Sequence, residues 1–238
     1  LTKWRSELEK VSFSPMDANN CIESAVFEEQ RLLGEVCRRI IGDSTVLIQA
    51  IEDCNWTDQK LMEKLDLLSR EQIPEEWNLH GYKALNLSLW FSNLCDRINH
   101  LQNLSTRSLN LGLFSTPENI IAASKQDAAR RLHLPLEKLV LHLDPDQGDL
   151  TLVGMTLLCA TYSDGRLNAS DEVLNPFPDM NLVWDTQEIE DGLVIPCFLS
   201  TSKTKLVCEV SLPSDHSQSK AWWQAHGPAL ILQKTADM

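Results

Sequence analysis

The sequence predicts an α+β fold: an N-terminal helical region, then a small antiparallel β-barrel with a short helix near the C-terminus. Three observations support this prediction. Apolar residues recur at the helical spacing i, i+3, i+4, i+7 in the first half of the chain. The period changes to two after Pro135. Short apolar segments then alternate with turn sequences, as in a small barrel or sandwich. We therefore expect a helical region over residues 1–134 and a β-barrel over residues 135–238.

The first half contains the pattern of successive amphipathic helices, with signals that separate them. Gly42 interrupts the first helix at a cost of about 1 kcal/mol relative to Ala, so a kink or break can occur there. Thr57 or Asp58 can cap the second helix, and Pro74 ends the segment that follows it. Pro117 suits the first turn of the fourth. The expected helices cover residues 24–51, 57–68, 87–104 and 117–134.

The second half contains apolar segments of strand length separated by turns. Gly154 lies inside a long apolar run and indicates a bulge or a close approach of the backbone. The sequence Ser163-Asp164-Gly165-Arg166 is typical of a hairpin turn. A short helix is expected at residues 219–226. The expected strands cover residues 139–143, 150–162, 181–184, 193–199, 205–212 and 228–232.

Charge and composition exclude several classes of partner. The 238 residues carry a formal net charge of −13, which a nucleic acid or an anionic membrane would repel. The densest basic cluster is Lys125, Arg130 and Arg131 with His133 behind them, which is too short for a duplex contact. No apolar run approaches the roughly 20 residues that cross a bilayer. The seven cysteines form no CxxC motif, and we expect them to be reduced, mostly buried thiols.

The sequence contains no recognisable catalytic apparatus. Neither GxxxxGK[ST] nor GxGxxG occurs, so a standard phosphate-binding loop is excluded. No two histidines lie at the i, i+4 spacing of a helical metal site. His142, on an apolar strand, is interpreted as a satisfied strand histidine rather than a ligand. We therefore expect no enzyme activity, cofactor or metal in this chain.

Trp222 and Trp223 are the residues that most clearly suggest a contact surface. Consecutive helical positions point about 100° apart, so both rings are hard to bury in one small barrel. Tryptophan is also a frequent anchor of interfaces. Trp222 and Trp223 are therefore our candidates for a contact with another domain.

Seven segments in a fixed order resemble the C-terminal region of dynein heavy chains. Ile73-Pro74-x-x-Trp77 is similar to the "(L/I)PxxW" segment of that family. The sequence departs from the family pattern at Phe114-Ser115-Thr116, where the family has a doubled Phe, and at His226 and Pro228, which replace Arg and Val. These departures indicate a divergent member or a heavy-chain-like paralogue. The matching segments are residues 73–77, 89–101, 113–130, 153–160, 193–198, 212–214 and 222–232.

The resemblance implies a non-catalytic domain that caps one face of an AAA+ motor ring. It implies packing on ring modules of the same heavy chain and modulation of the coupling between ATP hydrolysis and microtubule-based movement. ATP and Mg²⁺ would belong to the parent motor. Other dynein subunits would be reached indirectly, and microtubules only through the parent motor. The implied location is the cytoplasm and cytoskeleton, with the axoneme of a cilium or flagellum as an alternative.

Two other readings remain open at this point. A free-standing adaptor could bind proteins through tryptophan-rich surfaces without any enzymatic activity. A barrel could also bind a small ligand in a pocket with convergent polar groups. Ring modules encoded upstream of this sequence would favour the motor, and a deep polar pocket would favour the ligand-binding barrel.

Overall fold

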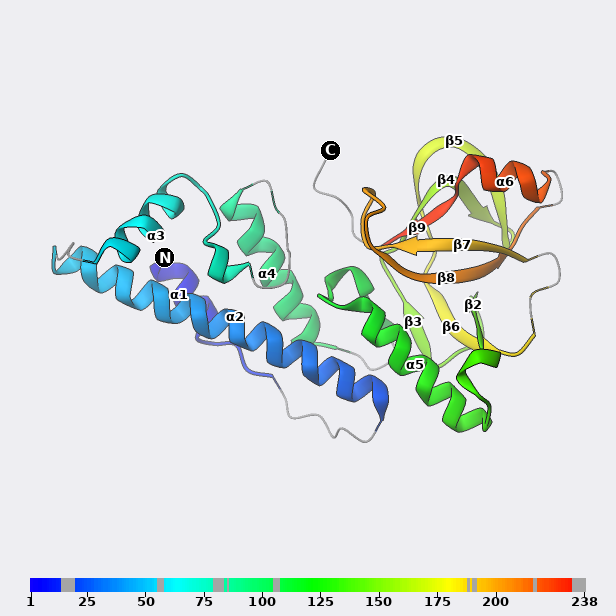
Figure 1. The fold of residues 1–238 in the computed structure, drawn as a ribbon, viewed down its shortest axis with the longest axis horizontal. Coiled ribbons are helices and arrows are strands. Elements are labelled where there is room, and N and C mark those ends of the chain that lie inside the picture. The colour runs from blue at the N-terminus through cyan, green and yellow to red at the C-terminus, as the bar shows by residue number, and fades with distance from the viewer. Residues whose placement is uncertain are drawn as a thin grey trace. The chain divides into compact units, whose positions relative to one another are not determined.

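The protein folds as two compact units (Figure 1). The helical unit comprises Leu1–Ala18 and Val26–Asn103, and the sheet unit comprises Asn19–Ala25 and Leu104–Met238. The computed structural model describes residues 1–13, 20–54, 58–78, 84, 86–104, 108–187, 189, 192–215 and 218–232. The predicted division at residue 135 marks the change from helices to strands. The helix before it, Pro117–Leu132, nevertheless belongs to the sheet unit.

The helical unit confirms the first three predicted helices and adds a short one at the N-terminus. The long helix α2 continues through Gly42 without a break, and a side chain at that position would meet nothing within 4 Å. Asp58 caps α3 by accepting from the Lys60 amide, whereas the alternative cap Thr57 lies outside the described residues. Asn86 caps α4 through the Leu89 amide. The elements are α1 (Thr2–Leu8), α2 (Cys21–Glu52, whose first turn belongs to the sheet unit), α3 (Gln59–Ser69), the 3-10 turn η1 (Glu75–Trp77) and α4 (Leu87–Gln102).

The helical unit holds polar groups inside its core as well as apolar ones. Trp77 is buried, and its indole Nε1–H donates to Asp43 at 2.6 Å. The same carboxylate pairs with Lys64 at 2.8 Å, so α2, α3 and η1 meet at one residue. Arg97 on α4 forms a buried ion pair with Glu29 on α2, with 3.7 Å between Nη2 and Oε2. Buried charges are costly unless paired, so this pair fixes how α2 and α4 pack.

The described residues of the sheet unit form one mixed sheet of nine strands in the order β1-β3-β6-β2-β8-β7-β9-β4-β5. The predicted barrel is wrong because the sheet is not closed: β1 and β5 are its two ends. An isolated bridge joins Leu167 of β5 to Ser214, beyond the end of β8. The sheet is also not purely antiparallel, since β1/β3, β2/β8 and β7/β9 are parallel. The strands are β1 (Ser108–Leu109), β2 (Val140–Asp144), β3 (Leu150–Leu152), β4 (Thr156–Ser163), β5 (Arg166–Pro176), β6 (Met180–Asp185), β7 (Gly192–Phe198), β8 (Leu206–Pro213) and β9 (Ala229–Ile231).

Two glycines explain how the backbone turns between these strands. The long apolar run at residues 150–162 forms two strands, β3 and β4, because Gly154 separates them at φ +75°. A Cβ atom there would lie 2.8 Å from the side-chain nitrogen Nδ2 of Asn110, which confirms the predicted close approach to the backbone. Asp164 and Gly165 both have positive φ and join β4 to β5, as a two-residue hairpin loop of this kind requires.

Two helices and two 3-10 turns complete the sheet unit. Helix α5 (Pro117–Leu132) begins at the predicted proline, and α6 (Lys220–His226) matches the predicted short helix. The 3-10 turns are η2 (Leu111–Leu113) and η3 (Leu136–Lys138). The core of the unit is formed by side chains from the sheet and from both helices, including Leu157, Leu212, Ile120 and Trp223, each at most 1% exposed.

Candidate docking surface

The C-terminal end of α5 and the turn that follows it form a concave surface of the sheet unit. Helix α5 ends at His133, which adopts the left-handed conformation at φ 55°. The Leu134 amide donates to the Ala129 carbonyl at 3.0 Å, which closes the helix end in the manner of a Schellman motif. Pro135 cannot continue the helix, so the backbone turns back into η3.

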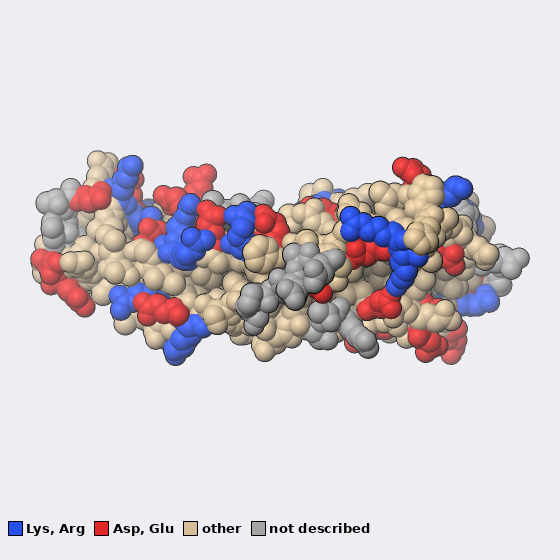
Figure 2. Space-filling view, turned by 90° about the horizontal axis from the view of Figure 1, so that it is seen from below, with Lys and Arg blue, Asp and Glu red and all other residues tan. Residues whose placement is uncertain are grey.

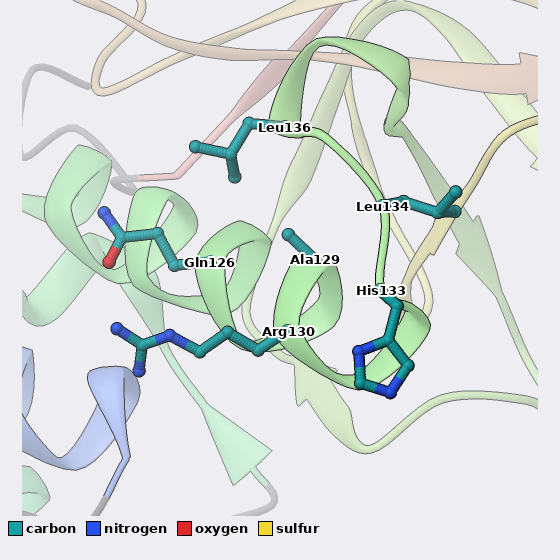
Figure 3. Close-up of a pocket in the computed structure, with 6 residues that line it drawn as sticks. All are labelled: Gln126, Ala129, Arg130, His133, Leu134 and Leu136. Atoms are coloured by element: carbon teal, nitrogen blue, oxygen red, sulfur yellow. The ribbon is translucent and has the colours of Figure 1, made fainter.

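This reversal leaves a shallow pocket of about 460 Å³ between α5 and the returning segment. We call it the α5–η3 groove. In Figure 3 the helix contributes Gln126, Ala129 and Arg130, and Leu136 approaches from the returning segment. The groove is lined by Gln126, Ala129, Arg130, His133, Leu134 and Leu136.

The basic side chains of α5 differ in whether they are already engaged. Lys125 lies over the ring of Trp184, 5.2 Å from its centroid, which is a cation–π arrangement. Arg131 forms an ion pair with Asp149. Arg130 is exposed and forms no salt bridge with any residue that the structure describes. Of the three, Arg130 is therefore the cation available to a partner.

Helix α5 is also held by the first turn of α2. Asn20 and Glu23 form two hydrogen bonds there: the Glu23 amide donates to the Asn20 side chain at 2.6 Å, and the Asn20 side chain donates to the Glu23 side chain at 3.0 Å. The Asp127 carboxylate of α5 accepts from the amides of Cys21 and Ile22, at 3.1 and 3.4 Å. A carboxylate is stabilised at a helix N-terminus, so Asp127 anchors α5 to the first turn of α2.

The groove also exposes apolar surface at its edge. Leu136, which lines the groove, is 40% exposed, although leucine is mostly buried in folded proteins. Figure 2 shows a group of basic side chains on the part of the sheet unit where α5 runs. Leu136 and Arg130 both line the groove, so together they can accept an apolar side chain and a carboxylate. The groove thus has the chemistry of a docking surface rather than of a catalytic site.

The structure separates the two predicted tryptophans. Trp223 is 1% exposed and packs in the core, whereas Trp222 is half-buried. The Trp222 ring is stacked on His226, with centroids 3.5 Å apart and an angle of 19° between the rings. Ser219 caps α6 by accepting from the Trp222 amide at 3.2 Å. The prediction of a domain contact at this pair therefore depends on Trp222 and remains a prediction.

The predicted strand histidine has a structural hydrogen bond. His142 is buried, and its Nε2 lies 2.8 Å from the Gln187 carbonyl, which accepts a hydrogen bond and so places the proton on that nitrogen. Within the described ranges, no three His, Cys, Asp or Glu side chains are grouped to hold a metal ion. No described helix combines the length and apolar character needed to cross a membrane.

Comparison with known proteins gives a consistent result over almost the whole sequence. Residues 2–232 match the family described as the C-terminal domain of the dynein heavy chain. The chain is 25% identical to the cytoplasmic dynein heavy chain of Dictyostelium discoideum over 210 residues, which is 80% of this chain and 4% of that protein. It is 24% identical to the cytoplasmic heavy chain of Caenorhabditis elegans over 180 residues, 71% of this chain and 4% of that protein. A ciliary dynein beta chain of Heliocidaris crassispina is 33% identical over 80 residues, 31% of this chain and 2% of that protein. The chain thus spans about 4% or less of the length of these relatives.

Proposed function

The chain belongs to the family of dynein heavy-chain domains that lie at the C-terminus, and on that premise we propose that it is a non-catalytic domain of a microtubule motor. In this proposal it packs on AAA+ ring modules of the same heavy chain and modulates the coupling of ATP hydrolysis to movement. ATP and Mg²⁺ act in the parent motor and not in this domain. Microtubules and other dynein subunits are reached through that motor, in the cytoplasm or in a cilium.

The observation that carries this proposal is the family match from residue 2 to residue 232. The named relatives are cytoplasmic and ciliary dynein heavy chains, which supports a cytoskeletal location. A domain that rests on a ring can change the relative free energies of ring conformations only through contacts that differ between them. The α5–η3 groove supports this role, since it combines Arg130 with the exposed Leu136.

The test uses the full-length protein that contains this domain, with Leu136 changed to Asp. Leu136 is 40% exposed, so we expect the domain to fold and the ratio of microtubule-stimulated ATPase rate to gliding velocity to change. The expected change in this ratio is at least about twofold.

The matched control is Val173→Asp on β5, an exposed apolar residue at 66% exposure. It introduces the same charge on the sheet unit outside the groove, and we expect it to leave the ratio unchanged. An unchanged ratio in the leucine variant would remove the groove from the proposal. A full-length protein without any microtubule-stimulated ATPase would contradict the motor function itself.

A further inference from the structure

Cys197 of β7 and Cys208 of β8 lie directly opposite each other in the sheet unit. The two strands are antiparallel, and residues that face each other in such a pair have Cα atoms about 4.5–5.5 Å apart. A disulfide spans Cα separations of about 4.4–6.8 Å. The strand register thus places the two cysteines at a separation that a disulfide can bridge.

The two side chains also share one face of the sheet and contact each other. Cys197 follows the buried residues Leu193 and Ile195 at period two, and Cys208 precedes the buried Val210 in the same way. A hydrogen bond with the Cys208 thiol, together with burial, raises the pKa of Cys197. Both thiols are free in the structure.

The two cysteines differ in their access to solvent. Cys197 is 2% exposed, whereas Cys208 is half-buried. Strand β2 pairs with β8 at Ser211, nearer the other end of the strand, and no described strand pairs with Cys208 on that side. A small oxidant in solution can therefore reach Cys208 first, and Cys197 lies behind it as the second thiol.

The hydrogen-bond ladder between β7 and β8 is interrupted next to Cys197 and Cys208. The register shifts between Cys197 and Phe198, because Phe198 pairs with Leu206 and leaves Val207 as an extra residue on β8. A β-bulge bends its strand and disrupts the ladder locally. The strands beside the pair are therefore not fixed by a continuous set of ladder hydrogen bonds, and they can adjust when a covalent bond forms.

We propose that Cys197 and Cys208 are an oxidative modification site, which a hydroperoxide converts to a disulfide across β7 and β8. With hydrogen peroxide, the Cys208 sulfur attacks one peroxide oxygen, the O–O bond breaks, and a sulfenic acid and one water form. The Cys197 sulfur then attacks the Cys208 sulfur, the S–O bond breaks, and the Cys197 proton leaves with the hydroxyl as a second water. Two thiols and one peroxide thus give one disulfide and two waters.

The disulfide would close the base of the turn that joins β7 to β8. In this turn the hydroxyls of Ser200 and Ser202 lie 2.8 Å apart. Lys203 donates to the Gly227 carbonyl at the end of α6, at 3.4 Å. Lys205 pairs with Glu118 in the first turn of α5 at 2.8 Å. The modification therefore restrains a turn that contacts both helices of the sheet unit.

The experiment is peroxide titration of the full-length protein, followed by blocking with N-ethylmaleimide, trypsin digestion without reductant and mass spectrometry. The diagnostic product is the tryptic peptide 167–203 linked to the tryptic peptide 206–220. The exposed Cys54 serves as an internal gauge of oxidant exposure. We expect the linked peptide to reach at least half occupancy under conditions that oxidise Cys54, and to disappear when dithiothreitol is added.

A second measurement, hydrogen exchange, tests whether the disulfide restrains the turn, and two serine variants test which cysteines form it. Hydrogen exchange of residues 199–205 should slow at least threefold on oxidation and recover on reduction. Cys208→Ser should abolish both the link and the slowing. Cys159→Ser, which removes a half-buried thiol of the same unit, should retain both.

Absence of the linked peptide while Cys54 is oxidised, or a link from Cys208 to another cysteine, would overturn the assignment. Unchanged exchange in the linked protein would overturn the proposed restraint on the turn.

Discussion

The helical unit and the sheet unit reach a stable core by different means. The helical unit packs amphipathic helices around a buried ion pair and a buried tryptophan hydrogen bond. The sheet unit depends on strands that pair across long sequence separations, such as β4 with β9. The buried ion pair of the helical unit is costly when one partner is lost. Among the described residues the sheet unit buries polar side chains but no ion pair, and removal of one of its apolar core side chains costs packing volume. This difference predicts which substitutions each unit tolerates.

The largest expected effect is the loss of the buried ion pair in the helical unit. Arg97→Met removes the guanidinium from a buried carboxylate and should lower the free energy of unfolding of this unit by about 3–5 kcal/mol. Glu29→Leu combined with Arg97→Met should recover most of this loss. Urea unfolding, with hydrogen exchange to assign each transition, provides the measurement.

The control for this prediction is the exposed ion pair between Glu28 and Arg31 on α2. Glu28→Gln should leave the unfolding midpoint unchanged, because exposed pairs contribute little to stability. A shift of the sheet-unit transition in the Arg97 variant would show that the two units do not have separate cores.

The next effect distinguishes the two adjacent tryptophans of the sheet unit. Trp223→Ala removes a ring that is 1% exposed and should lower the free energy of unfolding of this unit by about 3–5 kcal/mol. Trp222→Ala removes a half-buried ring stacked on His226 and should cost about 1 kcal/mol. Thermal unfolding of both variants measures the difference. Equal losses would contradict the assignment of one ring to the core and the other to the surface.

The burial of this tryptophan pair illustrates what the sequence can predict. Adjacent helical residues point in different directions, so the sequence already indicated that both rings would not be buried together. Helices α2 to α5 were likewise predictable, because their apolar period and caps are local. Gly154 and the Asp164-Gly165 turn were recognised for the same reason.

The barrel prediction failed because sheet closure depends on pairings between distant segments. Nothing local indicates that β9 lies between β7 and β4, or that β1 and β5 remain the ends of the sheet. Strand β5 was missed since it is an edge strand with few buried residues, and its Val173 is exposed. The basic cluster on α5 was visible in the sequence, but the reversal at His133 that creates the groove was not.

A smaller effect compares the same kind of cap in each unit. Asn86→Ala removes the cap of α4 and Ser219→Ala removes that of α6. Each should lower the free energy of unfolding of its own unit by about 1 kcal/mol. Hydrogen exchange of the first turns of α4 and α6 reports each loss separately. A change of exchange in the unit that was not altered would contradict this separation.

The smallest expected effect is a dependence of the helical unit on pH. Burial lowers the pKa of His100 below its ordinary value of 6.5. The unfolded state therefore binds the proton more readily, so stability is full above about pH 6.5 and declines as the pH falls through the folded pKa. His100→Gln should flatten this decline, whereas His133→Gln on the sheet unit should not. Urea midpoints between pH 7.5 and pH 5 provide the test, and an unchanged slope in the His100 variant would contradict it.

The central claim is that the sheet unit docks on other modules of a motor heavy chain through the α5–η3 groove. Lysine cross-linking of the full-length protein tests it most directly, because Lys138 lies in η3 beside the groove and Lys3 is an exposed lysine of the helical unit. We predict that Lys138 forms cross-links to AAA+ ring modules and is protected from single-ended modification relative to Lys3. If Lys138 were modified as freely as Lys3 and formed no such cross-links, the claim would be contradicted.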